Sequence, residues 1–100
     1  MFVERTEVII KEGAVNEALA ILGEMKAVSI PSGYDPSRLR LYRCGYGPRN
    51  AIAWEIEFED NEDRAKFWAE MRNNQEYIEL RDKVWKLVEP GGINELWWLR

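Results

Sequence analysis

Hydrophobic and polar residues alternate with a period of two along residues 50–59. Successive side chains of an extended chain point to opposite sides, so this alternation predicts a strand with one covered face. The apolar side contains Ile52, Trp54, Ile56 and Phe58. The opposite side contains Ala53, Glu55, Glu57 and Glu59. We expect the apolar side to lie under helices.

Three other segments, residues 2–10, 38–46 and 93–99, are predicted to be strands. The first is rich in β-branched residues, and the last follows the helix-stopping sequence Glu89-Pro90-Gly91-Gly92. The sequence Gly45-Tyr46-Gly47-Pro48-Arg49 joins residues 38–46 to residues 50–59 as a hairpin turn. It resembles a phosphate-binding loop only faintly, because the lysine and the following helix of such loops are missing.

Helical periodicity occurs in residues 14–27 and 61–88, where apolar side chains recur every three or four positions. Capping and acidic residues precede the second segment, at Asp60-Asn61-Glu62-Asp63. Its pattern weakens at Asn73-Asn74, which predicts two consecutive helices or one kinked helix. Residues 30–36 contain two prolines and a glycine and are expected to form a loop.

The order strand, helix, strand, strand, helix, strand predicts an α+β protein with a ferredoxin-like βαββαβ fold. Its four-stranded antiparallel sheet would carry helices on one face only. One hundred residues suffice for one core, so we expect a single domain over residues 1–100.

The uncovered face of the sheet is predicted to carry Arg38, Arg40, Tyr42 and Cys44 beside Glu55 and Glu57. This register follows because Leu39 and Leu41 must join the apolar side. One of Trp97 and Trp98 must also lie on the uncovered face, whichever side the last strand buries. Two interpretations remain: a solvated ladder of Arg–Glu pairs, or a face covered by a second copy that encloses a cavity.

Composition narrows the function classes. The net charge is −4, so no basic face indicates a nucleic-acid partner. No apolar stretch reaches the length of a membrane span and no secretory leader is recognisable, so we expect a cytoplasmic protein without membrane contact. Cys44 is the single cysteine, which rules out an intramolecular disulfide.

Candidate chemistry is sparse. The chain lacks histidine, which removes the commonest general base and most imidazole metal sites, so we predict no cofactor and no metal. A carboxylate site for Mg²⁺ or Ca²⁺ at Glu55, Glu57 and Glu59 is less favoured than ion pairs with nearby arginines. Cys44 is interpreted as a packing residue rather than a nucleophile. Trp54, Trp68 and Trp85 are interpreted as core residues.

The sequence resembles the dimeric α/β-barrel superfamily, in particular its antibiotic-biosynthesis-monooxygenase-like and NIPSNAP-like members. The resemblance rests on Trp54-Glu55-Ile56-Glu57-Phe58-Glu59-Asp60, followed by Arg64, Phe67 and Trp68 and by Asn74-Gln75-Glu76-Tyr77. It implies a homodimer in which two sheets form a barrel, and it implies no single activity. Haem-degrading members bind iron through a histidine, which this chain lacks.

These observations favour a homodimer that binds a small polar or aromatic molecule. The residues predicted to contact the ligand are Arg40, Tyr42, Glu55, Glu57 and Trp98. The alternative is a cofactor-independent monooxygenase for an aromatic or polyketide-like substrate, in which Arg40 or Arg5 stabilises a substrate anion. Whether the protein is an enzyme stays open at this point.

Overall fold

A computed structural model describes residues 1–29 and 34–100 of the chain. The elements, in chain order, are β1 (Phe2–Ile9), α1 (Val15–Ser29), the short 3₁₀ helix η2 (Pro36–Arg38), β2 (Leu39–Arg43), β3 (Ala51–Phe58), α2 (Asn61–Arg72), α3 (Gln75–Trp85) and β4 (Ile93–Trp98). Of the predicted loop over residues 30–36, residues 30–33 lie outside the described part of the chain.

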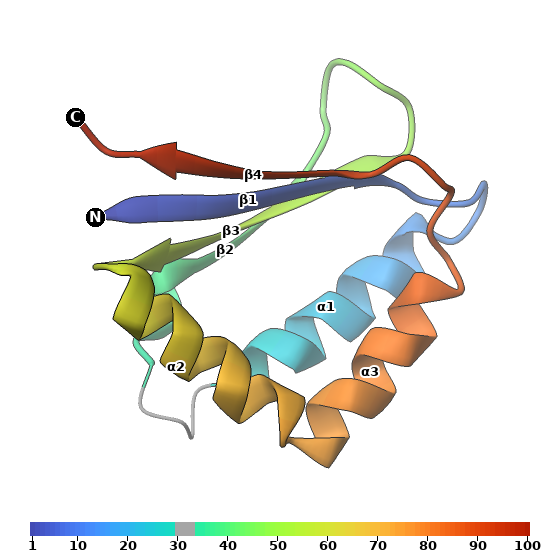
Figure 1. Cartoon of the computed structure of the whole chain (residues 1–100). Coiled ribbons are helices and arrows are strands. Elements are labelled where there is room, and N and C mark those ends of the chain that lie inside the picture. The colour runs from blue at the N-terminus through green and yellow to red at the C-terminus, as the bar shows by residue number, and fades with distance from the viewer. Residues whose placement is uncertain (30–33) are drawn as a thin grey trace.

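The strands form one sheet in the order β2-β3-β1-β4, and every neighbouring pair is antiparallel. All three α-helices lie against the same face of the sheet, and the opposite face is bare (Figure 1). The loop between β2 and β3 rises on the bare side. The predicted ferredoxin-like α+β architecture is therefore confirmed.

Two helices, rather than one kinked helix, follow β3. The Asp60 side chain accepts a hydrogen bond from the Asp63 amide at the start of α2, and Asn74 caps α3 by accepting from the Tyr77 amide. Such caps pair backbone N–H groups that a helix start leaves free. The helical region ends at Trp85, earlier than the predicted Val88, because the chain turns there and the Glu89 amide bonds to the Ile9 carbonyl of β1.

Strand β2 is shorter than the predicted segment 38–46. Asp35 caps η2 by accepting from the Ser37 amide, so Arg38 belongs to a helical turn before the strand begins. The predicted place of Arg38 beside Arg40 and Tyr42 is consequently wrong. Its guanidinium bonds the Glu57 carbonyl oxygen at 2.8 and 3.0 Å and also contacts the Asp63 carboxylate of α2.

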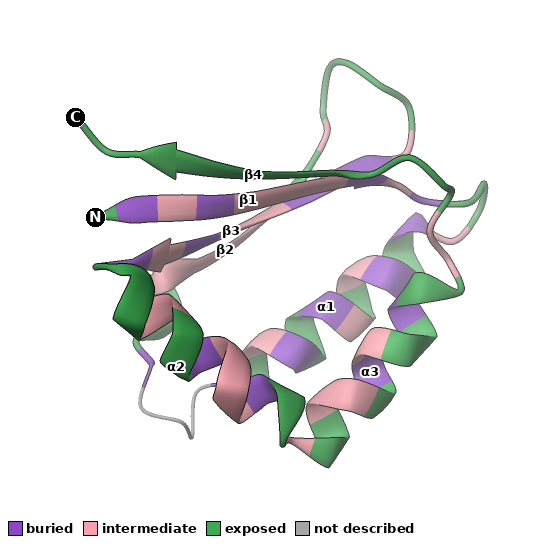
Figure 2. Ribbon diagram, in the orientation of Figure 1, coloured by how far each residue is buried: buried purple, intermediate pink, exposed green. Residues whose placement is uncertain are grey.

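The predicted register of the hairpin is confirmed, since Leu39 pairs with Ile56 and Leu41 pairs with Trp54 on the helix-facing side. Buried residues occur on β1 and β3 and on all three α-helices, whereas β4 is exposed along its length (Figure 2). Side chains of the helix-facing side form two core clusters with the helices. One contains residues of β1, β3, α1 and α3, including Val8, Leu22 and Val84. The other joins Phe2 and Phe58 to Phe67 of α2, with the Phe58 and Phe67 rings 5.5 Å apart.

None of the helices in the described ranges is long and apolar enough to cross a lipid bilayer.

Candidate functional site

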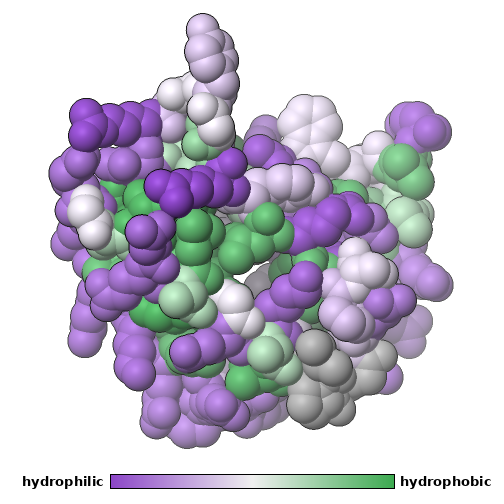
Figure 3. Space-filling view, turned by 180° about the vertical axis from the view of Figure 1, so that it is seen from behind, coloured by the Kyte–Doolittle hydropathy of each residue, from purple (hydrophilic) through white to green (hydrophobic). Residues whose placement is uncertain are grey.

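A cavity of about 390 Å³ lies between the helix-facing side of the sheet and the helices. In space-filling view, apolar side chains border a hollow in the molecular surface (Figure 3). Its apolar lining comes from all three helices and from β2 and β3: Leu22, Met25, Leu39, Leu41, Trp54, Ile56, Phe67, Trp68, Val84 and Trp85. Its polar lining is Glu4, Thr6, Lys26, Ser29, Arg40, Glu55, Tyr77, Arg81 and Asn94.

Three tryptophans that the sequence analysis assigned to the core line this cavity. Trp54 and Trp68 are half-buried, as expected of side chains that face a hollow. Trp85, the last residue of α3, is 47% exposed, so its assignment to the core is wrong. It lies on the cavity side of α3 at the last residue of the helix, where about half of its surface stays exposed.

A buried carboxylate lies at the sheet side of the cavity. Glu4, on the central strand β1, is only 6% exposed. One carboxylate oxygen accepts from the Arg64 Nε and the Trp68 Nε1, each at 2.9 Å. The other accepts from the Asn94 Nδ2 at 3.1 Å. Side chains from α2 and β4 therefore converge on one group of β1.

These contacts decide the charge state of Glu4. Burial acts to raise the pKa of its carboxyl, but the hydrogen bonds from Arg64, Trp68 and Asn94 outweigh burial and lower the pKa below its usual value. Glu4 is thus ionised at neutral pH and paired with Arg64. A carboxylate that already accepts bonds from three side chains is poorly suited to act as a general base.

Tyr77 supplies a different polar group to the cavity. Burial raises the pKa of its hydroxyl to about 12, and the nearby Glu4 charge acts in the same direction while Arg81 opposes it. The phenol is therefore neutral at physiological pH and keeps its proton to donate. Among the described residues, its hydroxyl has no hydrogen-bond partner.

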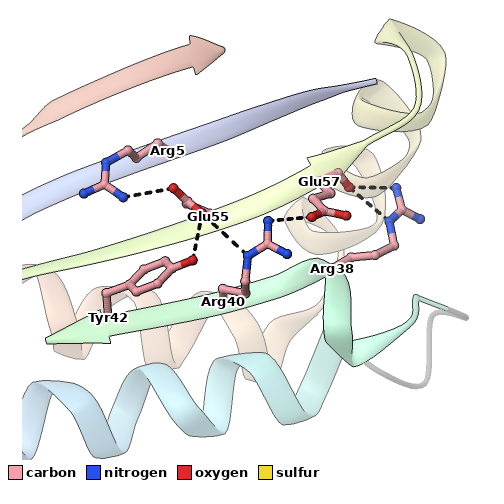
Figure 4. A network of polar contacts seen from close by, with 6 residues as sticks. All are labelled: Arg5, Arg38, Arg40, Tyr42, Glu55 and Glu57. Carbon is pink, nitrogen blue, oxygen red and sulfur yellow. Dashed lines mark hydrogen bonds and ion pairs between the residues drawn. The ribbon is translucent and has the colours of Figure 1, made fainter. Parts of the chain in front are cut away.

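The bare face of the sheet carries the ion pairs predicted from the hairpin register (Figure 4). Glu55 accepts from the Arg5 Nη1 at 3.0 Å and from the Tyr42 hydroxyl at 2.9 Å. Arg40 bridges Glu55, at 3.6 Å, and Glu57. Burial acts to raise the pKa of Glu55, but Tyr42 and the two arginines lower it below its usual value. Four of the five predicted ligand-binding residues thus form one network with Arg5.

Trp98, the fifth predicted ligand-binding residue, is on the other side of the sheet. It pairs with Phe2, whose ring lies 4.9 Å away, and Phe2 faces the helices. The prediction that it shares a face with Arg40 is wrong, because the register places Trp97, opposite Val3, on the bare face instead. Of the five residues, Arg40 and Glu55 also line the cavity. Ligand contact by any of the five stays a prediction.

The sequence analysis missed Glu4, Thr6, Tyr77, Arg81 and Asn94. A signal for the first two was present, because Glu4 and Thr6 share parity with the apolar residues Phe2 and Val8 along β1. A carboxylate on the buried side of a central strand requires partners and is a candidate functional group.

Within the described ranges, no group of three or more Asp, Glu, Cys or His side chains is close enough to hold a metal ion.

Replacement of Glu4 by Gln is expected to lower the free energy of unfolding by about 2–3 kcal/mol at pH 7, because the Gln amide would leave the Arg64 charge uncompensated. The ionised wild-type group stabilises fully above its usual pKa of 4.5, and this stabilisation is lost as the pH falls through the lowered folded-state pKa. Chemical denaturation of both proteins should be measured from pH 7 to pH 3. The difference between their free energies of unfolding should become smaller below pH 4.5.

Glu12→Gln provides the matched control, since Glu12 forms an exposed ion pair with Arg49 and should change stability little at any of these pH values. A Glu4→Gln protein as stable as wild type at pH 7 would contradict the assignment.

No protein-family model matches the chain, and no curated protein matches it. Solved structures do match. A NIPSNAP family protein from Agrobacterium tumefaciens, Atu5224, superposes with a TM-score of 0.81 at 17% identity, covering 99% of this chain and 85% of that one. Protein Atu4242 of the same organism superposes with a TM-score of 0.80 at 23% identity, covering 96% of this chain and 90% of that one.

SnoaB from Streptomyces nogalater, described as a cofactor-independent oxygenase, matches with a TM-score of 0.71 at 15% identity, over 99% of this chain and 93% of that one. Atu4242 is described as a NIPSNAP family protein of unknown function, and this likeness, at 22–23% identity, concerns the fold. The resemblance inferred from the sequence is therefore confirmed at the level of architecture: the chain has the fold of NIPSNAP family proteins and of antibiotic biosynthesis monooxygenases.

Proposed function

We propose that the protein binds a small, largely apolar molecule of aromatic character in the cavity between the sheet and the helices. The observation that carries the proposal is a hollow of about 390 Å³ whose walls are mainly aliphatic and aromatic, with a few converging polar groups. Small-molecule sites usually combine these properties. The tryptophans Trp54, Trp68 and Trp85 offer flat surfaces against which a ring system can stack.

The polar groups indicate how such a ligand would be oriented. Glu4 and Trp68 bond to each other, so they have little capacity left for a ligand. The Tyr77 hydroxyl is a neutral donor, and it is free within the described part of the chain. Lys26 and Arg81 add positive charge to the lining. A ligand oxygen, neutral or anionic, therefore fits best beside Tyr77 and Arg81.

Titration of the protein with 2-naphthol, followed by quenching of tryptophan fluorescence, tests this site. Met25→Trp should weaken binding by about tenfold or more, because the larger side chain occupies the cavity. Tyr77→Phe should weaken it by about fivefold, the usual effect of one lost neutral hydrogen bond. Tyr46→Ala, a change in the fully exposed hairpin loop, is the control and should bind as wild type does. Equal affinity of all four proteins would refute the proposed site.

We further propose that the protein is a homodimer in which two copies pack their bare sheet faces together. Trp97 is 58% exposed on this face, and Ile93, four residues earlier on the same side of β4, is 49% exposed. Exposed large apolar groups on one face of a sheet typically mark an interface. The ion pairs of Arg5 and Arg40 with Glu55 and Glu57 balance their own charges, which lowers the cost of covering them.

Analytical ultracentrifugation should give twice the 11.8 kDa chain mass at micromolar concentration. Trp97→Asp should shift the population to monomer, since two carboxylates would be buried in a symmetric contact. Trp85→Asp is the matched control on the helix side and should leave the mass unchanged. A wild-type monomer at this concentration, or loss of the dimer in both variants, would contradict the proposed face.

Cofactor-independent oxygenation is a second candidate function. It is supported by the described activity of SnoaB, which has the same fold, and by Arg81 in the cavity, where a cation would stabilise the anion of an acidic aromatic substrate. The sequence suggested Arg40 or Arg5 for this role. Arg40 lines the cavity but already pairs with Glu57, and Arg5 pairs with Glu55 on the bare face.

Anthrone, whose CH₂ group loses a proton readily, is a suitable test substrate: its reaction with O₂ gives anthraquinone and water. If the protein is an oxygenase, an oxygen electrode should record consumption that depends on the protein and that falls at least about tenfold in Arg81→Met. Consumption equal to the buffer rate, for wild type as for the variant, would exclude this activity on anthrone and leave binding alone.

A further inference from the structure

A second hollow, of about 380 Å³, lies where the chain passes from α3 to β4. We call it the α3–β4 groove. Its lining residues are Thr6, Val8, Trp85, Val88, Glu89, Pro90, Gly91, Gly92, Ile93 and Asn94. The segment after α3 is attached to β1 by backbone contacts, the Glu89 amide to the Ile9 carbonyl and a β-bridge between Val88 and Ile10. The segment that lines the groove is therefore held against the sheet.

Gly92 lies close to β1 at the inner side of the groove. A Cβ at this position would lie 3.0 Å from the Val8 Cγ1 and 3.2 Å from the Glu7 carbonyl oxygen. A larger residue here would push the Val8 side chain or the segment away by a few tenths of an ångström, so glycine favours this close approach to β1. The neighbouring Gly91 has a φ of 98°, which other residues adopt with strain. The two glycines together permit the path that the backbone takes from α3 to β4.

The groove and the cavity meet, since three residues line both: Thr6, Trp85 and Asn94. Thr6 and Asn94 are direct partners in the β1–β4 register, and the Asn94 Nδ2 donates to the Thr6 hydroxyl oxygen at 2.8 Å. Trp85 approaches from the end of α3. The junction thus has a hydrogen-bonded polar pair on the sheet side and an indole on the helix side.

The polar pair at the junction keeps unused hydrogen-bonding capacity. The Thr6 hydroxyl accepts from Asn94 and retains its own proton to donate. The Asn94 side-chain nitrogen donates to Glu4 and Thr6, while its carbonyl oxygen bonds to none of the described residues. A polar linker such as an amide can use either group, because its C=O can accept from the Thr6 hydroxyl or its N–H can donate to the Asn94 carbonyl oxygen.

We infer that the cavity and the α3–β4 groove are two subsites of one binding site. Its ligand is a molecule in two parts, a planar apolar body in the cavity and an apolar chain in the groove, joined by an amide-like group at Thr6 and Asn94. The inference rests on the proposed binding function and specifies the ligand class. A molecule of this shape buries apolar surface on both sides of the junction without leaving the linking polar group unpaired.

Two probes test the inference, N-methyl-2-naphthamide and N-hexyl-2-naphthamide, which differ only in five methylene groups. Dissociation constants are measured by isothermal titration calorimetry. The hexyl amide should bind about tenfold or more tightly than the methyl amide, because its chain enters the groove. Val88→Trp and Glu89→Trp, which place an indole in the groove, should each bring the ratio of the two constants close to one.

Thr6→Val removes the hydroxyl with little change of shape and should weaken both amides about fivefold, since both carry the linking group. Tyr46→Trp adds an indole in the exposed hairpin loop and should keep the wild-type ratio. Circular dichroism and cooperative thermal unfolding establish that each variant is folded. If one of the two groove variants does not fold, the other provides the test.

The outcomes distinguish failure of the two-subsite inference from failure of the proposed binding function. Equal binding of both probes by wild type would overturn the two-subsite inference and leave the cavity as a binding site. A hexyl preference that survives both groove variants would also overturn it, because the chain would then leave the cavity elsewhere. Failure of both probes to bind would count against the proposed binding function itself, and the inference would fail with it.

Discussion

The pairing register of β1 is the constraint on which the rest of this structure depends. This central strand pairs with β3 on one side and β4 on the other, so its alternation is imposed on three strands together. Once Phe2 and Val8 pack under the helices, Glu4 and Thr6 must lie on the same side, and Arg5 must lie on the opposite side with Glu55. The register therefore places a carboxylate inside the molecule and a layer of ion pairs outside it.

An ionised carboxylate inside a protein is stable only when other groups replace its lost hydration. Glu4 obtains this compensation from Arg64 and Trp68 of α2 and from Asn94 of β4. The same contacts position α2 and β4 relative to the central strand, so an electrostatic requirement contributes to the tertiary arrangement. They also determine which donors stay free for a guest molecule, because the Trp68 N–H is occupied whereas the Tyr77 hydroxyl is not.

Sequence reasoning recovered the parts of this fold that depend on local periodicity. The alternation of residues 52–58 and the pairing of Leu39 and Leu41 with that side were sufficient to predict the sheet faces. The cavity was not predictable in this way, because its volume depends on how Trp54, Trp68 and Tyr77 pack together from separate elements. The predicted position of Trp98 was wrong for a related reason. Both tryptophans of β4 are apolar, so alternation alone could not decide which one faces the helices, and only pairing with Phe2 decides it.

The separation of the two sheet faces has a consequence for how such a protein can evolve. Side chains on opposite faces have a layer of backbone between them, and changes at sites without shared partners usually add in free energy. The walls of the cavity can therefore accumulate substitutions that alter what fits inside, while the side with Arg5, Tyr42 and Glu57 stays as it is. Arg40 and Glu55 lie along the cavity wall, but their side chains pair with each other on the bare side of the sheet. A substitution of either side chain would therefore change the ion-pair network and leave the shape of the cavity to the residues of the opposite parity.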